Sequence, residues 1–129
     1  MENIKADTAS PLRVGFVGCG RHGGERIYPS LSPAGLQLVA TCDLDRERAK
    51  RYARRFAPEN GEIPSDYTDH REMCEKEQLD AVLVVTGPQG HYEITREIVE
   101  AGLPVWEEKP PAPTAARALE VVAAAEKAG

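Results

Sequence analysis

The chain has 129 residues, enough for one domain, and its 41% hydrophobic and 29% charged residues are typical of a soluble globular protein. The formal net charge of −5 argues against a nucleic-acid partner, because there is no basic excess to displace the counterions around phosphates. No apolar run approaches the roughly 20 residues of a membrane-spanning helix, so no membrane partner is expected.

The predicted elements alternate between strands and helices. In chain order they are a strand over Leu12–Val17, a helix over His22–Leu31 distorted near Pro29, a strand over Leu36–Cys42, a helix over Arg46–Phe56, a strand over Ile63–Tyr67, a helix over Asp69–Glu77, a strand over Ala81–Val85, a helix over Gly90–Ala101, a strand over Pro104–Glu107 and a helix over Thr114–Ala128. Asp45 and Thr114 are expected to cap the helices that follow them, and Gly102 to end one. Alternating β and α elements with apolar strands predict an α/β fold with a doubly wound parallel sheet over residues 12–129.

Two further features concern the cellular setting of the chain. Residues 1–11 are polar and lack the apolar core of a secretory signal, so we expect a flexible N-terminal arm. The cysteines are odd in number and scattered, which predicts reduced thiols and a cytoplasmic location; they are Cys19, Cys42 and Cys74. Cys19 and His22 have no second pair of ligands nearby in the sequence, so no metal site is expected.

A glycine-rich turn directly follows the first predicted strand and opens a helix. It reads Gly18-Cys19-Gly20-Arg21-His22-Gly23, and Asp43 closes the second strand about 20 residues further on. This is the fingerprint of a Rossmann-type dinucleotide-binding domain.

Each position of this fingerprint has a physical role. Gly18 permits the tight turn out of the strand, Gly20 lets a pyrophosphate approach the backbone, and Gly23 lets the helix pack close to the sheet. The helix N-terminus, with the backbone of Arg21 and His22, offers N–H groups to the phosphates. Asp43 is expected to accept the hydroxyls of the adenosine ribose, although it could instead cap the helix that follows.

A second pair of motifs is more specific than the glycine turn. Thr86-Gly87-Pro88-Gln89-Gly90-His91 follows the fourth strand, and Glu108-Lys109-Pro110 follows the fifth. With the fingerprint, these motifs make residues 12–129 resemble the cofactor-binding domain of the glucose–fructose oxidoreductase, inositol dehydrogenase and rhizopine-catabolism (Gfo/Idh/MocA) family.

The resemblance implies an NAD(P)-dependent oxidoreductase that moves a hydride between a nicotinamide cofactor and a hydroxyl or keto carbon of a sugar, cyclitol or similar substrate. It places Thr86, Gly87 and Pro88 along the cofactor groove, His91 at its edge and Glu108 beside the nicotinamide. Lys109 would assist proton transfer at the substrate, a role that suits a lysine at the carboxyl end of a parallel strand. NAD is the expected cofactor, because Asp43 repels the 2′-phosphate of NADP; NADP stays possible because Arg46 is close by.

The chain departs from the family pattern in two ways. Glu107 stands where an apolar or small residue is usual before Glu108. The sequence also ends at Gly129, before the sixth strand and the substrate domain of family members, so we expect this chain alone to bind cofactor without turnover. The fifth strand would then be a sheet edge, which predicts a homodimer through that edge.

Other readings stay open at this point. A methyltransferase that binds S-adenosylmethionine shares the glycine loop, but it usually has an acidic residue where Phe16 stands and a third glycine where His22 stands. A stand-alone nucleotide sensor without catalysis is the main alternative. At the level of single residues, His91 could be a structural residue at the helix start and Lys109 a solvated surface lysine.

Overall fold

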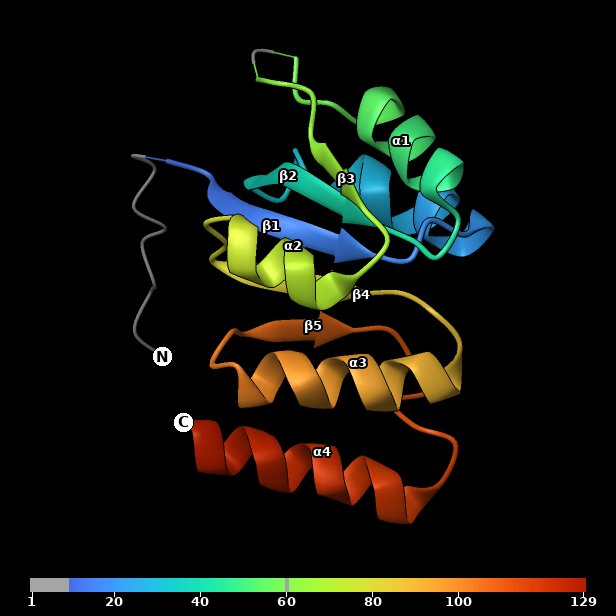
Figure 1. The fold of residues 1–129 in the computed structure, drawn as a ribbon, viewed down its shortest axis with the longest axis vertical. Coiled ribbons are helices and arrows are strands. Elements are labelled where there is room, and N and C mark those ends of the chain that lie inside the picture. Colours follow the sequence, from blue (N-terminus) through green and yellow to red (C-terminus); the bar gives the residue numbers. More distant parts are fainter. Residues whose placement is uncertain (1–9, 60) are drawn as a thin grey trace.

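The computed structural model describes residues 10–59 and 61–129, so most of the predicted arm over residues 1–11 lies outside the described part. Five parallel strands form one sheet in the order β3-β2-β1-β4-β5, which confirms the doubly wound α/β fold (Figure 1). The strands are β1 (Leu12–Val17), β2 (Leu36–Cys42), β3 (Ser65–Tyr67), β4 (Ala81–Val84) and β5 (Val105–Glu107).

The helices cover both faces of this sheet. They are α1 (Arg46–Arg55), α2 (His70–Lys76), α3 (Pro88–Glu100) and α4 (Ala115–Ala128), together with a short helical segment after β1 that consists of η1 (Gly23–Ile27) and η2 (Tyr28–Ser30). Asp45 and Thr114 cap α1 and α4 as predicted, each accepting a backbone N–H of the first turn. The observed bounds agree with the predicted ones to within two residues at every end, and the segment after β1 differs in the type of helix.

Two hydrophobic cores lie on the two faces of the sheet. One joins Phe16 and Leu38 to Tyr28 of the η segment and to Ala49 of α1. The other gathers apolar residues of β1, β2 and β4 against α2 and α3; its buried members are Val17, Ala40, Cys42, Met73, Val82, Val84 and Ile98. Burial on both faces explains why β4 is apolar throughout.

The segment after β1 is not the regular helix that the sequence predicts. It passes through a π turn, in which Tyr28 N–H donates to Gly23 O, and then through a 3₁₀ turn that contains Pro29. Proline has no N–H, and its ring clashes with the carbonyl four residues earlier, so a regular α-helix cannot continue through it. The change of pitch places the Tyr28 ring 3.8 Å from the Phe16 ring, centroid to centroid.

Gly24, the residue after the predicted Gly23, is the glycine of this segment that leaves less room for a side chain. A Cβ atom at Gly24 would lie 2.5 Å from the hydroxyl oxygen of Tyr52, whereas one at Gly23 would lie at an ordinary 3.5 Å from the ring of Tyr28. The tight contact at Gly24 is therefore with helix α1, whereas a Cβ atom at Gly23 would lie 3.6 Å from the ring of Phe16 on β1.

Helix α4 lies at the edge of the molecule, where it packs against α3, and α3 lies between α4 and strand β5 in Figure 1. Its outer face is apolar and open, with Leu119 67% and Val122 52% exposed. Trp106 on β5 is 47% exposed, and β5 pairs with β4 on one side only. Among the described residues, no helix is both long and apolar enough to cross a membrane.

Candidate functional site

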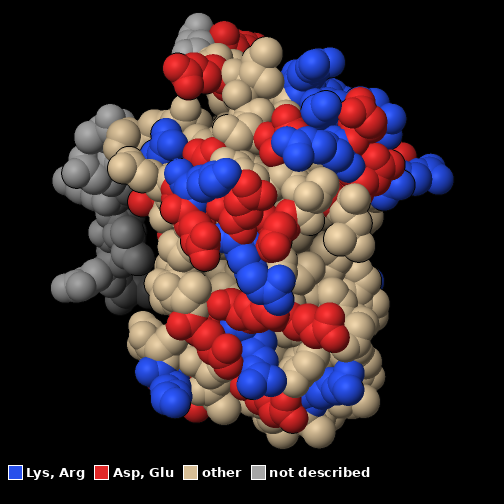
Figure 2. Space-filling view, in the orientation of Figure 1, with Lys and Arg blue, Asp and Glu red and all other residues tan. Residues whose placement is uncertain are grey.

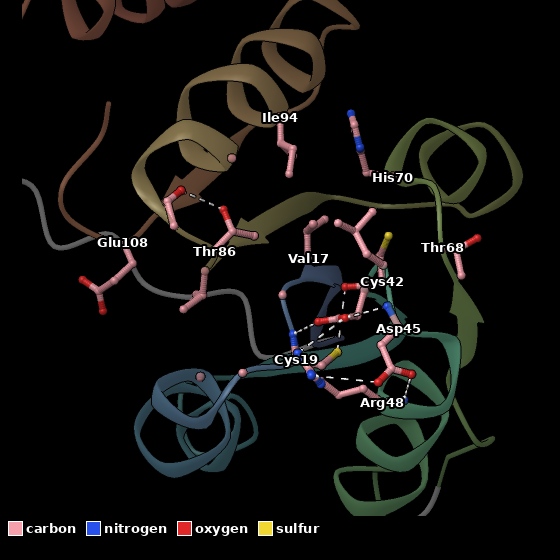
Figure 3. Close-up of a pocket in the computed structure, with 18 of the residues that line it drawn as sticks. Val17, Cys19, Cys42, Asp45, Arg48, Thr68, His70, Thr86, Ile94 and Glu108 are labelled. Atoms are coloured by element: carbon pink, nitrogen blue, oxygen red, sulfur yellow. Dashed lines mark hydrogen bonds and ion pairs between the residues drawn. The ribbon is translucent and has the colours of Figure 1, made fainter. Parts of the chain in front are cut away.

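A cleft of about 1180 Å³ opens at the carboxyl ends of the strands. Its walls come from the glycine turn after β1, the segments that follow β2, β3 and β4, helix α3 and the segment after β5 (Figure 3). Ligands of open α/β sheets bind in this crevice, at the point where the strand order reverses. The fold therefore brings the predicted motifs together at one edge of the sheet.

The glycine turn forms the floor at the middle of the cleft. Gly18 has a φ of +104°, and a Cβ atom there would lie 2.0 Å from the carbonyl oxygen of Val85, so a side chain cannot be accommodated. A Cβ atom at Gly20 would meet no atom within 4 Å, which leaves the backbone open to the cleft. The first intrahelical bond is donated by Gly24 N–H to Gly20 O, so the N–H groups of Arg21, His22 and Gly23 precede the helical ladder, and this turn suits a phosphate group.

Asp43 lies at one end of the cleft and is held in place by two backbone groups. Its Oδ2 accepts the N–H of Cys19 at 2.9 Å, and its Oδ1 accepts the N–H of Asp45 at 2.9 Å. The side chain is 12% exposed. Each carboxylate oxygen has two lone pairs, so Asp43 can still accept a bond from a hydroxyl group in the cleft.

Arg48 is the cation at this end. Its guanidinium nitrogens lie 3.8 Å from Oδ1 of Asp43 and 3.9 Å from Oδ2 of Asp45. Arg46, which the sequence placed near the ribose, instead pairs with Asp66 at 3.0 Å and does not line the cleft. Because Asp45 caps α1, Asp43 is left free to face the cleft.

Glu108 lies at the opposite end of the cleft from Asp45 and Arg48 (Figure 3). Its Oε2 is 2.8 Å from Nε2 of His22, and its Oε1 accepts the backbone N–H of Lys109 at 3.0 Å. The hydrogen bond to His22 and then the one to the Lys109 backbone hold the pKa of Glu108 below its usual range. Lys109 lines the cleft beside it.

The segment after β4 contributes only some of its predicted residues to the cleft. Thr86 and Gly87 line it, but Pro88 and His91 do not. His91 is 1% exposed, and both of its ring nitrogens have partners: Nε2 accepts the N–H of Thr86 at 2.9 Å, and Nδ1 lies 2.7 Å from the carbonyl oxygen of Pro110. The structure thus places His91 behind the cleft, where it connects two of the segments that form the wall.

Glu107, the unexplained departure from the family pattern, lies away from the cleft. Its Oε2 accepts the hydroxyl of Thr95 on α3 at 2.7 Å. Thr95 is 3% exposed, so the carboxylate provides an acceptor for a buried hydroxyl.

A group of charged residues in the cleft wall was missed from the sequence. Oε2 of Glu97 on α3 lies 2.6 Å from Nε2 of His70, and its Oε1 accepts a hydrogen bond of 2.6 Å from the Arg71 guanidinium; both partners belong to α2. Burial tends to raise the pKa of Glu97, but the bonds from His70 and Arg71 outweigh it and lower the pKa overall. The sequence held one signal for His70 and Arg71. They follow the end of β3, and the carboxyl ends of parallel strands lie at the same edge of the sheet as the other motifs.

The cysteines near the glycine turn are poor nucleophiles. Burial raises the pKa of Cys19 to about 12 and that of Cys42 to about 12. The described residues contain no cluster of His, Cys, Asp and Glu side chains that could hold a metal ion.

Comparison with known proteins gives a consistent result. Residues 12–129 match a family described as "Oxidoreductase family, NAD-binding Rossmann fold", which carries the name GFO_IDH_MocA. The chain is 37% identical to inositol 2-dehydrogenase 2 of Paenarthrobacter aurescens over 115 residues, covering 88% of this chain and 32% of that protein.

Two solved structures are also similar. A dehydrogenase from Chromobacterium violaceum superposes with a TM-score of 0.82 at 32% identity, over 92% of this chain and 34% of that one. A dehydrogenase from Bordetella pertussis in complex with NADH and UDP-GlcNAcA has a TM-score of 0.78 at 27% identity, over 92% of this chain and 35% of that one. The chain spans about a third of the length of these proteins.

Proposed function

The chain belongs to the Gfo/Idh/MocA oxidoreductase family and matches its NAD-binding Rossmann fold, and we propose that it binds the cofactor for hydride transfer at a hydroxyl or keto carbon of a sugar or cyclitol. The substrate class rests on the relatives, one of which is an inositol dehydrogenase and one of which is in complex with UDP-GlcNAcA. Residues 12–129 form one dinucleotide-binding domain in this proposal. A cytoplasmic location agrees with the three free cysteines.

The observation that carries this function is the order of groups along the cleft. Asp43 lies at one end, the open backbone at Gly20 in the middle, and Glu108 with Lys109 at the other end. An extended dinucleotide matches this order. Asp43 would accept hydroxyls of the adenosine ribose, and the turn from Gly20 to Gly23, with Arg21 and His22, would bind the pyrophosphate.

The nicotinamide end of the cleft is assigned to Glu108, Lys109, Thr86 and Gly87. A bound nicotinamide ring supplies the hydride acceptor or donor. Lys109 would hold the substrate oxygen by a hydrogen bond and help to move its proton, since loss of a hydride from an alcohol carbon must be matched by loss of the hydroxyl proton. His91 supports the wall from behind through its bonds to Thr86 and Pro110, and Pro88 begins helix α3 next to Gly87.

Calorimetric titration of this chain with NADH, NADPH and S-adenosylmethionine tests the assignment. We expect NADH to bind most tightly and S-adenosylmethionine to give no heat of binding. Selective binding of S-adenosylmethionine would contradict the proposal. Trp106, the single tryptophan, lies next to the Glu107-Glu108 segment and gives an independent fluorescence signal for NADH.

A homodimer through the edge of β5 is part of the same proposal. It is supported by the unpaired side of β5 and by the exposed apolar residues of α4. The alternative function, a nucleotide sensor without catalysis, predicts the same NADH binding but gives Lys109 no chemical role.

A further inference from the structure

Lys109 is the residue on which the proposed chemistry depends, and its backbone is held on both sides. On the N-terminal side, Oε1 of Glu108 accepts a hydrogen bond from the N–H of Lys109, and Oε2 of the same carboxylate is bonded to Nε2 of His22. His22 belongs to the helical turn that follows β1, 86 residues earlier in the chain. The position of the Lys109 backbone is therefore coupled to the glycine turn through one carboxylate.

The competing partners of His22 and Glu108 are few. Arg21, the neighbour of His22, pairs with Glu25 at 2.7 Å. The His22 side chain is 56% exposed and that of Glu108 is 21% exposed. A charged hydrogen bond of 2.8 Å between them is of the strong type.

On the C-terminal side of Lys109, the carbonyl of Pro110 is held by His91. A backbone N–H only donates, so the bond from Thr86 N–H fixes Nε2 of His91 as an acceptor. A neutral His91 then carries its proton on Nδ1 and donates it to Pro110 O at 2.7 Å. Since His91 is 1% exposed, this link between the end of β4 and the segment after β5 is shielded from water.

We propose that His22 and His91 are positioning residues that hold Lys109 between them at the nicotinamide end of the cleft. The inference rests on the proposed function for the role of Lys109. The two histidines come from different elements, the turn after β1 and helix α3, so Lys109 is fixed relative to both the glycine turn and the end of β4. Neither residue contacts the reacting atoms in this arrangement.

The test compares variants of the cofactor-free chain by NMR relaxation of the Lys109 amide. We expect an order parameter of about 0.85 for Lys109 in the wild type and a fall toward about 0.6 in His22→Ala. His22→Gln should recover most of the loss, because its amide N–H₂ can donate to Glu108 from nearly the same place as Nε2. An unchanged order parameter in His22→Ala would overturn the role of His22.

His70→Ala is the matched control for His22→Ala, since it removes another histidine–glutamate pair, His70–Glu97, at a different part of the cleft. Its Lys109 order parameter should equal that of the wild type. A similar fall in both variants would mean general loosening and would contradict the proposal.

His91 is buried, so its substitution could unfold the chain, and its role is tested by its tautomer instead. Long-range ¹H–¹⁵N NMR at neutral pH should show the proton on Nδ1. A proton on Nε2 would be incompatible with the bond from Thr86 and would overturn the role of His91. Failure of the wild type to bind NADH would overturn the proposed function alone, because none of these measurements uses cofactor.

Discussion

Asp43 is the residue that we expect to decide which dinucleotide the cleft accepts. Its carboxylate would accept a free 2′-hydroxyl and repel a 2′-phosphate, so we expect tighter binding of NADH than of NADPH. Asp43→Ala should weaken NADH binding by about 1–3 kcal/mol, and should weaken NADPH binding less because the repulsion is removed and Arg48 is released. Calorimetry at moderate salt measures both affinities.

The matched control for this change is Asp45→Ala. Asp45 caps α1, so its loss should cost about 1 kcal/mol of folding free energy while leaving NADH affinity nearly unchanged. Thermal melts of both variants are needed, because Asp43→Ala also leaves two backbone N–H groups without acceptors. Tighter binding of NADPH than of NADH by the wild type would contradict the assignment.

Lys109 is expected to act in the transition state and not in cofactor binding. In this chain, Lys109→Ala should therefore leave the dissociation constant for NADH nearly unchanged, whereas in a complete enzyme it should lower turnover. Trp106 fluorescence and calorimetry measure the affinity. A large loss of NADH affinity would show that Lys109 is a binding residue instead.

The cysteines differ in their expected reactivity. Thiolates are the reactive form, and burial raises the pKa of Cys19 and of Cys42 to about 12. Cys74 is half-buried, and burial raises its pKa as well. In the folded chain at pH 8, a thiol reagent should modify Cys74 first; peptide mass mapping at early times shows the order. Rapid labelling of Cys19 would mean that the glycine turn opens readily.

At the scale of elements, α2 and α3 are joined by the Glu97 carboxylate with His70 and Arg71. The pKa of Glu97 in the fold is lower than its ordinary value of 4.5, so its stabilising effect is present above about pH 4.5 and is lost as the pH falls through the folded value. Glu97→Gln should lower the free energy of unfolding at pH 7 by roughly 0.2–1 kcal/mol, a range suited to a side chain that is 37% exposed.

The difference in stability between wild type and Glu97→Gln should shrink as the pH is lowered below about 4.5. Urea unfolding at several pH values measures it. Glu100→Gln on the same helix is the control, since Glu100 makes only an exposed pair with Arg96 four residues earlier. A difference that stays constant down to pH 2.5 would exclude Glu97 as the titrating group.

The elements that local sequence determines were predicted correctly. The caps Asp45 and Thr114, the end of α3 at Gly102 and the apolar strand β4 all follow from residues within a few positions. The π turn after β1 was missed, because its pitch depends on the packing of Tyr28 against Phe16 as well as on Pro29.

The site shows the same division between local and long-range signals. The glycine turn and Asp43 form a local fingerprint, and they meet in the cleft as expected. The pair of His22 with Glu108 and the bonds of His91 join segments that are far apart or packed in three dimensions, and no spacing encodes them. The position of Arg48 in the cleft also had no signal in the sequence, because the basic run on α1 resembles an ordinary solvated face. Basic and acidic side chains are interspersed over the face of the molecule drawn in Figure 2, so a single arginine does not stand out there.

At the scale of the whole molecule, the sheet carries the site at the carboxyl ends of its strands, and among the described residues its two outer strands, β3 and β5, are each hydrogen-bonded on one side only. The five strands place their carboxyl ends along the cleft, while β5 has a neighbour only in β4. Helix α3 packs against β5 and, on its other side, against α4 (Figure 1); Val121 of α4 is buried, and Tyr92 of α3 donates a hydrogen bond to Glu120. The side that carries β5 and α4 therefore exposes three large apolar side chains, Trp106, Leu119 and Val122.

This β5–α4 side is where we expect two copies of the chain to meet. An edge strand offers unpaired N–H and C=O groups, and exposed apolar side chains lower their free energy by leaving water. Sedimentation velocity should show a coefficient that rises with protein concentration, and Leu119→Lys combined with Val122→Lys should keep the chain monomeric.

Ile63→Lys is the control, because Ile63 is 66% exposed, close to the 67% of Leu119, but lies just before β3 at the opposite edge of the sheet. The charges of Glu107 and Glu108 and the proline at 104 limit strand pairing, so contact through α4 should dominate. A monomer at all concentrations, or association that survives the α4 changes and is abolished by Ile63→Lys, would place the interface elsewhere or remove it.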